Sequence, residues 1–161
     1  MWRTPDSEAA EAVEKAGRDL NREIVHELNE AGVASVRVIG ADRGLLRFYE
    51  NRLGVGRTGW VARLVEQGVV VVVAAFADRG EASLQEVDAA AASAALAQDL
   101  GTAVAMIPSG GVDPQAPASV DDVSSLLPDA APARRVIEAG ASVVVLDRGA
   151  LRRGEDGIQV L

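Results

Sequence analysis

The stretch Gly68-Val-Val-Val-Val-Val-Ala-Ala-Phe76 decides the fold class. Its residues are apolar on both faces of a strand, which is typical of a parallel strand covered by helices on two sides. The apolar run from Val69 to Ala77 is nine residues long, about half of what a bilayer span needs. The sequence therefore predicts a buried parallel strand in an α/β protein and no membrane-spanning segment.

A long amphipathic helix is predicted ahead of this strand, over residues 5–31. Its apolar residues recur every three or four positions and form one stripe: Ala9, Val13, Ala16, Leu20, Ile24 and Leu28. Gly32 ends the helix. Gly17 costs about 1 kcal/mol relative to alanine, which leaves open a division into two shorter helices near Arg18.

The rest of the chain repeats one order of elements: a helix, a glycine and a strand. The helices are predicted over 5–31, 60–67, 87–100 and 132–139, and the strands after them over 33–39, 69–76, 102–107 and 142–146. A short strand over 157–161 follows, residues 78–86 form a small hairpin or a loop, and residues 108–131 form a surface excursion. This order predicts a three-layer α/β/α fold with a mostly parallel sheet.

Composition limits both the architecture and the function. The 161 residues suit one domain spanning residues 1–161. The formal charge of −8 disfavours nucleic acid and anionic membrane surfaces as partners. The absence of cysteine excludes thiolate chemistry, and the single histidine is too little for a His-rich metal centre. We expect a cytoplasmic protein without a resident metal.

Ligands of open α/β sheets collect at the carboxyl ends of the strands, so three loops are candidate sites: 40–46, 77–88 and 108–112. The first contains Gly40-Ala-Asp-Arg-Gly44, in which Asp42 lies between two glycines. The third contains Ser109, Gly110 and Gly111, whose backbone N–H groups can face an anion. A tight turn without a ligand is the alternative for each loop.

A literal G-x-G-x-x-G occurs at Gly54-Val-Gly-Arg-Thr-Gly59. Such a motif binds a dinucleotide when a buried strand precedes it and a helix follows it. The preceding residues 48–53 include Glu50, Asn51 and Arg52, which are not typical of a buried strand. A plain glycine-rich turn is therefore favoured over a cofactor site.

Residues 21–46 resemble the acetylglutamate kinase branch of the amino-acid kinase family. The family's N-K-E-I-V…L-N…G…A-V-G-L-S-G-x-D-G-x-L-I corresponds to Asn21-Arg-Glu-Ile-Val25, Leu28-Asn29, Gly32 and Val36-x-Val38-x-Gly40-x-Asp42-x-Gly44-Leu45-Leu46. The resemblance implies ATP-dependent phosphorylation of an acyl-amino-acid carboxylate in arginine biosynthesis, with ATP and Mg²⁺. It implies substrate contacts at Arg3, Gly40, Asp42, Gly44 and Asp88, and nucleotide contacts at Ser109, Gly110 and Gly111.

The chain departs from the family at the positions that carry catalysis. It starts where the family's first strands and phosphate loops would already be complete. Asp129 stands where the family has a lysine, Ala90 where it has the organising aspartate, and the only lysine is Lys15, in the first helix. Fixed cations stabilise the phosphoryl-transfer transition state, and each loss costs about 3 kcal/mol or more. We therefore expect a pseudokinase without catalytic residues that acts as a binding or regulatory subunit.

Two other functions and two kinds of partner remain open at this point. A minimal active kinase would hold Mg²⁺ with Asp42 and Asp88 and use arginines as counter-charges. An NAD(P)-binding domain similar to short-chain dehydrogenases would use Gly40-Ala-Asp-Arg-Gly44 as its glycine-rich turn. That family's Y-x-x-x-K pair is absent, because the residue four positions after Tyr49 is Leu53 and not a lysine. Because strands of the family are missing, we expect a homo-oligomer across an open sheet edge or a complex with a full-length kinase.

Overall fold

The structure is a computed structural model that describes residues 7–80, 83–107, 131–145 and 158–160. The chain forms two compact units, Met1–Asp88 and Ala89–Leu161. The first unit contains two helices and six strands among its described residues, and the second contains two helices and three strands. The expected surface excursion lies outside the described residues, except for Ala131.

The first helix, α1 (Ser7–Glu30), is continuous through Gly17. A Cβ at Gly17 would lie 2.5 Å from Cε2 of Phe76, so the missing side chain lets the helix pack directly on the aromatic ring. This contact offsets the low helix propensity of glycine, which is about 1 kcal/mol. The division into two helices near Arg18, which the sequence left open, does not occur.

The apolar stripe predicted along α1 is not the face that packs on the strands. Three of its four larger members are substantially exposed, Val13 at 40%, Leu20 at 58% and Ile24 at 40%, whereas Leu28 is half-buried. The face toward the strands includes Gly17 and Asn21 instead, and Asn21 is only 3% exposed. The helix is therefore turned so that small and polar residues approach the sheet, while much of the apolar stripe faces solvent.

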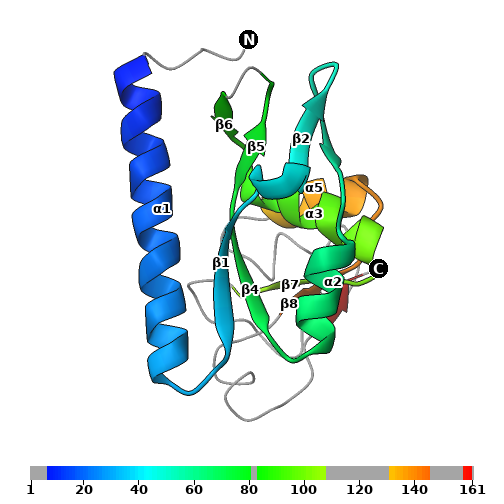
Figure 1. Ribbon diagram of the computed structural model, residues 1–161. Coiled ribbons are helices and arrows are strands. Elements are labelled where there is room, and N and C mark those ends of the chain that lie inside the picture. Colours follow the sequence, from blue (N-terminus) through cyan, green and yellow to red (C-terminus); the bar gives the residue numbers. More distant parts are fainter. Residues whose placement is uncertain (1–6, 81–82, 108–130, 146–157, 161) are drawn as a thin grey trace. The chain divides into compact units, whose positions relative to one another are not determined.

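Strand β1 (Ser35–Ile39) pairs in parallel with β4 (Val70–Ala74), with Ser35 opposite Val70 and Ile39 opposite Ala74. Helix α1 contacts both strands, and helix α2 (Gly59–Glu66) contacts β4. In Figure 1 the two strands lie between these helices. The prediction of a parallel strand with helices on two sides is confirmed, but the strand is not buried as expected: Val70 is 43% exposed and the other residues of β4 are half-buried.

A second sheet of the first unit has the order β3-β2-β5-β6. It consists of β2 (Leu46–Tyr49), β3 (Arg52–Val55), β5 (Phe76–Asp78) and β6 (Leu84–Glu86). Strands β2 and β5 are parallel, whereas β2–β3 and β5–β6 are antiparallel. Glu50 and Asn51 form the turn between β2 and β3 with φ of 48° and 66°, the left-handed values that two-residue hairpins require.

The second unit repeats the helix–glycine–strand order. Its elements are α3 (Ala89–Leu100), β7 (Val104–Met106), α5 (Ala131–Glu138), β8 (Val143–Val145) and β9 (Ile158–Val160). Strands β7 and β8 are parallel and β9 is antiparallel to β8. Alanines of α3 face α5, and Ala94, Ala133, Val136 and Val143 are fully buried. The predicted α/β class with parallel strands is thus confirmed.

No helix in the described part of the chain combines the length and the apolar character that crossing a membrane requires.

Candidate functional site

The loop after β1 begins at Gly40, where the backbone of the neighbouring strands leaves no room for a side chain. A Cβ at Gly40 would lie 2.6 Å from Cδ1 of Leu46, 3.2 Å from the carbonyl oxygen of Ala74 and closer still to that of Phe76. The Gly40 N–H donates to the carbonyl oxygen of Ala74 at 2.9 Å. The absence of a side chain at Gly40 therefore lets the chain backbone pass close to the backbone of Ala74 and Phe76.

Asp42 opens a short 3₁₀ turn, η1 (Asp42–Gly44), directly beyond β1. Its Oδ2 accepts a hydrogen bond from the N–H of Ile39 at 2.9 Å. Arg43 and Gly44 have positive φ values of 54° and 68°, and the Arg43 guanidinium lies 5.4 Å from the centre of the Trp60 ring. The loop is thus held by its own contacts, with the carboxylate of Asp42 tied to the end of the strand.

A cleft of about 430 Å³ lies between α1 and this end of β1. It is lined by Lys15, Arg18, Asp19, Asn21, Arg22, Arg37, Ile39 and Asp42. Four cations and two carboxylates among these residues give a balance of +2, on a chain whose formal charge is −8. A local surplus of positive charge in a concave site attracts small anions.

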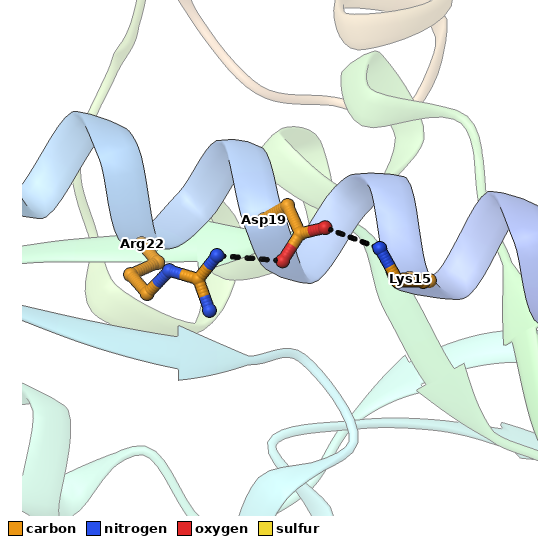
Figure 2. A network of polar contacts seen from close by, with 3 residues as sticks. All are labelled: Lys15, Asp19 and Arg22. Atoms are coloured by element: carbon orange, nitrogen blue, oxygen red, sulfur yellow. Dashed lines mark hydrogen bonds and ion pairs between the residues drawn. The ribbon is translucent and has the colours of Figure 1, made fainter.

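Three of the charged groups form a network on α1 (Figure 2). The Asp19 carboxylate accepts from Lys15 Nζ at 3.0 Å and from Arg22 at 2.9 Å. The hydrogen bond from Lys15, more than the attraction of Arg22, holds the pKa of Asp19 below its usual value. Asp19 therefore stays ionised and partly neutralises two of the four cations.

The other two cations of the cleft differ in how they are paired. Arg18 Nε donates to Glu14 Oε1 at 2.7 Å. The exposed side chain of Arg37, which stands on β1, forms no ion pair or hydrogen bond with the described residues. Within the part of the chain that the structure describes, the N–H donors of the Arg37 guanidinium thus have no partner and can bind a ligand in the cleft.

Asn21 anchors the helical side of the cleft. Its Nδ2 donates to the carbonyl oxygens of Val38 and Val72, at 3.0 Å each, and so ties α1 to both parallel strands. The side chain is 3% exposed, and its Oδ1 has no partner among the described residues. One buried amide therefore helps to hold the helical wall of the cleft against β1 and β4.

The outer edge of β1 is partly closed by side chains. Val70 N–H donates to the carbonyl oxygen of Ala34 and Gly40 N–H to that of Ala74, so by the alternation of a parallel ladder Ser35, Arg37 and Ile39 direct their backbone groups away from β4. Asn29 Oδ1 accepts from the N–H of Ser35 at 3.0 Å, and Asp42 accepts from Ile39. Arg37 stands between these two caps.

The predicted site residues fall into two groups. Of Gly40, Asp42, Gly44 and Asp88, the structure brings Asp42 to the cleft, whereas exposed Asp88 follows β6 and does not line it. Arg3, Ser109, Gly110 and Gly111 lie outside the described residues. Within the described ranges, no group of three or more His, Asp or Glu side chains could hold a metal ion.

Sequence reasoning missed Arg18, Arg22 and Arg37 as site residues. The four-residue spacing of Arg18 and Arg22 was a usable signal, because it puts both on one side of a helix. Arg37 interrupts an otherwise apolar strand between Val36 and Val38. A charge in that place indicates an edge strand with one side chain directed to solvent.

The glycines of the G-x-G-x-x-G segment allow close packing in and beside a β-hairpin. Gly54 lies in β3, and a Cβ there would be 2.8 Å from Cδ2 of Tyr49. Gly56 lies against the backbone of Gly44, and Gly59 begins α2. Residues 48–53 belong to the antiparallel hairpin β2–β3, so the prediction that they are not the buried first strand of a dinucleotide site is confirmed. The parallel strand that a dinucleotide fingerprint requires does not precede these glycines.

Comparison with known proteins bears on the fold. No family model and no curated protein matches the chain. A solved structure described as "X-ray structures of isopentenyl phosphate kinase" matches with a TM-score of 0.62 over 89% of this chain, at 13% sequence identity. The chain has an amino-acid-kinase-like fold. It spans 64% of the length of that isopentenyl phosphate kinase chain.

The amino-acid-kinase-like fold agrees with the family that residues 21–46 resemble, since isopentenyl phosphate kinase is a member of that family. At this level of sequence identity the agreement concerns the architecture alone and does not identify a substrate. Within an amino-acid-kinase-like fold, the cleft beside β1 lies at the carboxyl end of a parallel strand, where ligands of α/β proteins collect.

Proposed function

We propose that the chain is an amino-acid-kinase-like domain that binds a small anionic molecule in the cleft between α1 and β1 and does not transfer a phosphoryl group itself. The observation that carries the proposal is the cleft of about 430 Å³ lined by four cations and two carboxylates. Its balance stays positive, at +1, when Glu14, the partner of Arg18, is included, on a chain of formal charge −8. Acetylglutamate, with two carboxylates, is the first ligand to test, because the sequence resembles acetylglutamate kinases. The neighbour's name, isopentenyl phosphate kinase, also points to an anionic substrate.

The absence of catalysis is supported by the position of the only lysine. Lys15 is 80% exposed on α1, and its ammonium group is bound to Asp19. Phosphoryl transfer depends on cations fixed around the transferring group, in a site that excludes water. An exposed lysine engaged by a neighbouring carboxylate does not meet that requirement. A binding or regulatory role therefore fits these residues better than an active kinase.

ATP with Mg²⁺ is the pair that the fold family implies, and the described carboxylates do not fit the metal ion. Of the two carboxylates considered for Mg²⁺, Asp42 has one oxygen engaged by the N–H of Ile39. Asp88 has a partner of its own and does not line the cleft with Asp42. We therefore assign no step to a metal-bound nucleotide. A nucleotide contact at Ser109, Gly110 and Gly111 remains part of the proposal, outside the described residues.

An activity and binding assay on the purified chain tests this function. With ATP, Mg²⁺ and acetylglutamate, we expect no acyl phosphate above background, measured by trapping it as the hydroxamate, because the required cations are missing. Calorimetry with millimolar acetylglutamate should give heat. A complete acetylglutamate kinase serves as the positive control. Hydroxamate formation at a comparable rate would contradict the non-catalytic role, and a lack of heat would contradict binding of this ligand.

We also propose that the chain associates with a second copy of itself, or with a complete kinase in the cell. The caps on Ser35 and Ile39 leave little of the β1 edge for a new strand. The exposed apolar side chains of Val13, Leu20 and Ile24 on α1 support contact through that helix instead. Association through these residues would bury surface that is unfavourable in water.

Light scattering at tens of micromolar checks the association. We expect a mass above the 16.7 kDa of one chain. Leu20→Glu should bring the mass down, because a carboxylate would be buried in the contact. Val65→Glu is the control, since Val65 is exposed to a similar degree, 55% against 58% for Leu20, but stands on α2. A stable monomer of the unmodified chain would be the contrary result.

A further inference from the structure

Two arginines from different elements stand at the border of two neighbouring cavities. Arg22 of α1 and Arg37 of β1 line the cleft of about 430 Å³, and both also line a hollow of about 520 Å³ with Val25, His26, Asn29 and Val36. Lys15 and Arg18 line only the first cavity. The positive charge along this side of the first unit is therefore centred on Arg22 and Arg37.

We propose that Arg22 and Arg37 hold the doubly charged head of a small oxyanion, a phosphate monoester or a dicarboxylate, with Lys15 and Arg18 beside them. The proposal rests on the proposed function and deepens it, because it names the ligand class and the residues that select it. A guanidinium binds a phosphate or carboxylate group through two parallel N–H donors. Two guanidinium groups on facing elements can therefore hold one head group from two sides.

The two arginines favour a dianion over a monoanion. One guanidinium already engages both oxygens of a monocarboxylate, whereas a phosphate monoester or a dicarboxylate has further oxygens for the second guanidinium. The volume of about 430 Å³ suits a molecule of metabolite size. A polyanion such as nucleic acid would also meet the negative surface of a chain with a formal charge of −8, so a small ligand is favoured.

Asp19 competes with the ligand from within the site. Its carboxylate already binds Lys15 and Arg22, at 3.0 Å and 2.9 Å (Figure 2). A ligand must therefore displace Asp19 or share these two cations with it, whereas Arg37 has no such competitor among the described residues. Asp19 thus lowers the affinity for the anion, and Arg37 supplies the contact that costs no broken ion pair.

Calorimetric titration of the full chain at about 20 mM salt tests the site, with inorganic phosphate, succinate and acetate as probes. At least one of the two dianions should bind ten times more tightly than acetate, and its affinity should fall as NaCl is raised to 200 mM. Arg37→Gln should weaken the dianion at least tenfold. The matched control is Arg63→Gln on the exposed side of α2, which removes the same charge away from the cleft and should change affinity less than twofold.

A second pair of variants moves the affinity in the opposite direction. Asp19→Asn frees Lys15 and Arg22 and should strengthen dianion binding at least threefold. Glu66→Gln, at the end of α2, changes the net charge equally and should have less than half that effect. Circular dichroism of each variant checks that the fold is kept, and the gain with Asp19→Asn cannot arise from unfolding.

The outcomes separate this inference from the proposed function. Phosphate binding without succinate binding identifies a phosphoryl ligand, and the reverse identifies a dicarboxylate; both support the site when Arg37→Gln weakens them. Equal binding of acetate, no binding of any probe, or equal effects of Arg37→Gln and Arg63→Gln would overturn it. Hydroxamate formation in the activity assay would overturn the non-catalytic role and leave the anion site standing.

Discussion

Replacing Gly40 with alanine should destabilise the first unit by about 3 kcal/mol. The new Cβ would be 2.6 Å from Cδ1 of Leu46 and would crowd the carbonyl oxygens of Ala74 and Phe76. The Ala74 oxygen accepts the Gly40 N–H, so it cannot retreat without loss of a backbone hydrogen bond. Leu46 is fully buried, and its side chain has no free space into which it could move.

Urea unfolding followed by tryptophan fluorescence measures this effect, because both tryptophans, Trp2 and Trp60, belong to the first unit. The unfolding midpoint of Gly40→Ala should fall clearly below that of the unmodified chain. Gly59→Ala is the matched control: it stands at the start of α2 and its Cβ would meet nothing within 4 Å. That change should leave the midpoint unchanged or raise it slightly, because alanine favours helix. Equal midpoints for both variants would refute the packing argument.

Asn21→Asp should cost about 3 kcal/mol at neutral pH. The change removes the amide donor that binds the carbonyl oxygens of Val38 and Val72 and turns a carboxylate oxygen toward them. At 3% exposure the new charge is cut off from water. The same substitution at exposed Asn29 should cost much less, because its Oδ1 accepts from Ser35 and a carboxylate can do so equally well.

The cost of Asn21→Asp should depend on pH in a definite direction. Burial and the two facing carbonyl oxygens raise the pKa of the new carboxyl in the folded chain, whereas in the unfolded chain it stays near 3.9. Above about pH 4 the unfolded state therefore binds fewer protons than the folded state, and stability falls as pH rises. Urea midpoints at pH 4 and pH 7 should show a smaller deficit at pH 4. A deficit that is the same at both values would argue against burial of the charge.

The sequence predicted the parallel strands well because their signal is local. Five consecutive valines at 69–73 leave no polar face, and the structure places four of them in β4, which α1 and α2 contact. The hairpin β2–β3 was missed because only one of its faces is buried. Leu46 is fully buried while Arg47 and Tyr49 are exposed, and this alternation was obscured by the polar turn at Glu50 and Asn51.

The orientation of α1 could not be predicted from its own residues. The apolar stripe is a property of the helix alone, whereas the buried face depends on groups far along the chain. Asn21 is buried because it bonds to Val38 and Val72, 17 and 51 residues away. The cleft was missed for the same reason, since Arg22 and Arg37 meet only after β1 has folded back beside the helix. Long-range pairing of polar groups leaves no periodic pattern in a sequence.

The two caps on the outer edge of β1 affect whether molecules pair through this strand edge at high protein concentration. An open strand edge can recruit the same strand of another molecule and so start the growth of fibrils. Here the side chains of Asn29 and Asp42 already occupy the N–H groups of Ser35 and Ile39. Between these two caps an incoming strand would meet the exposed, charged side chain of Arg37. Next to its valine-rich strand β4, the molecule thus carries along β1 a barrier against amyloid-like stacking.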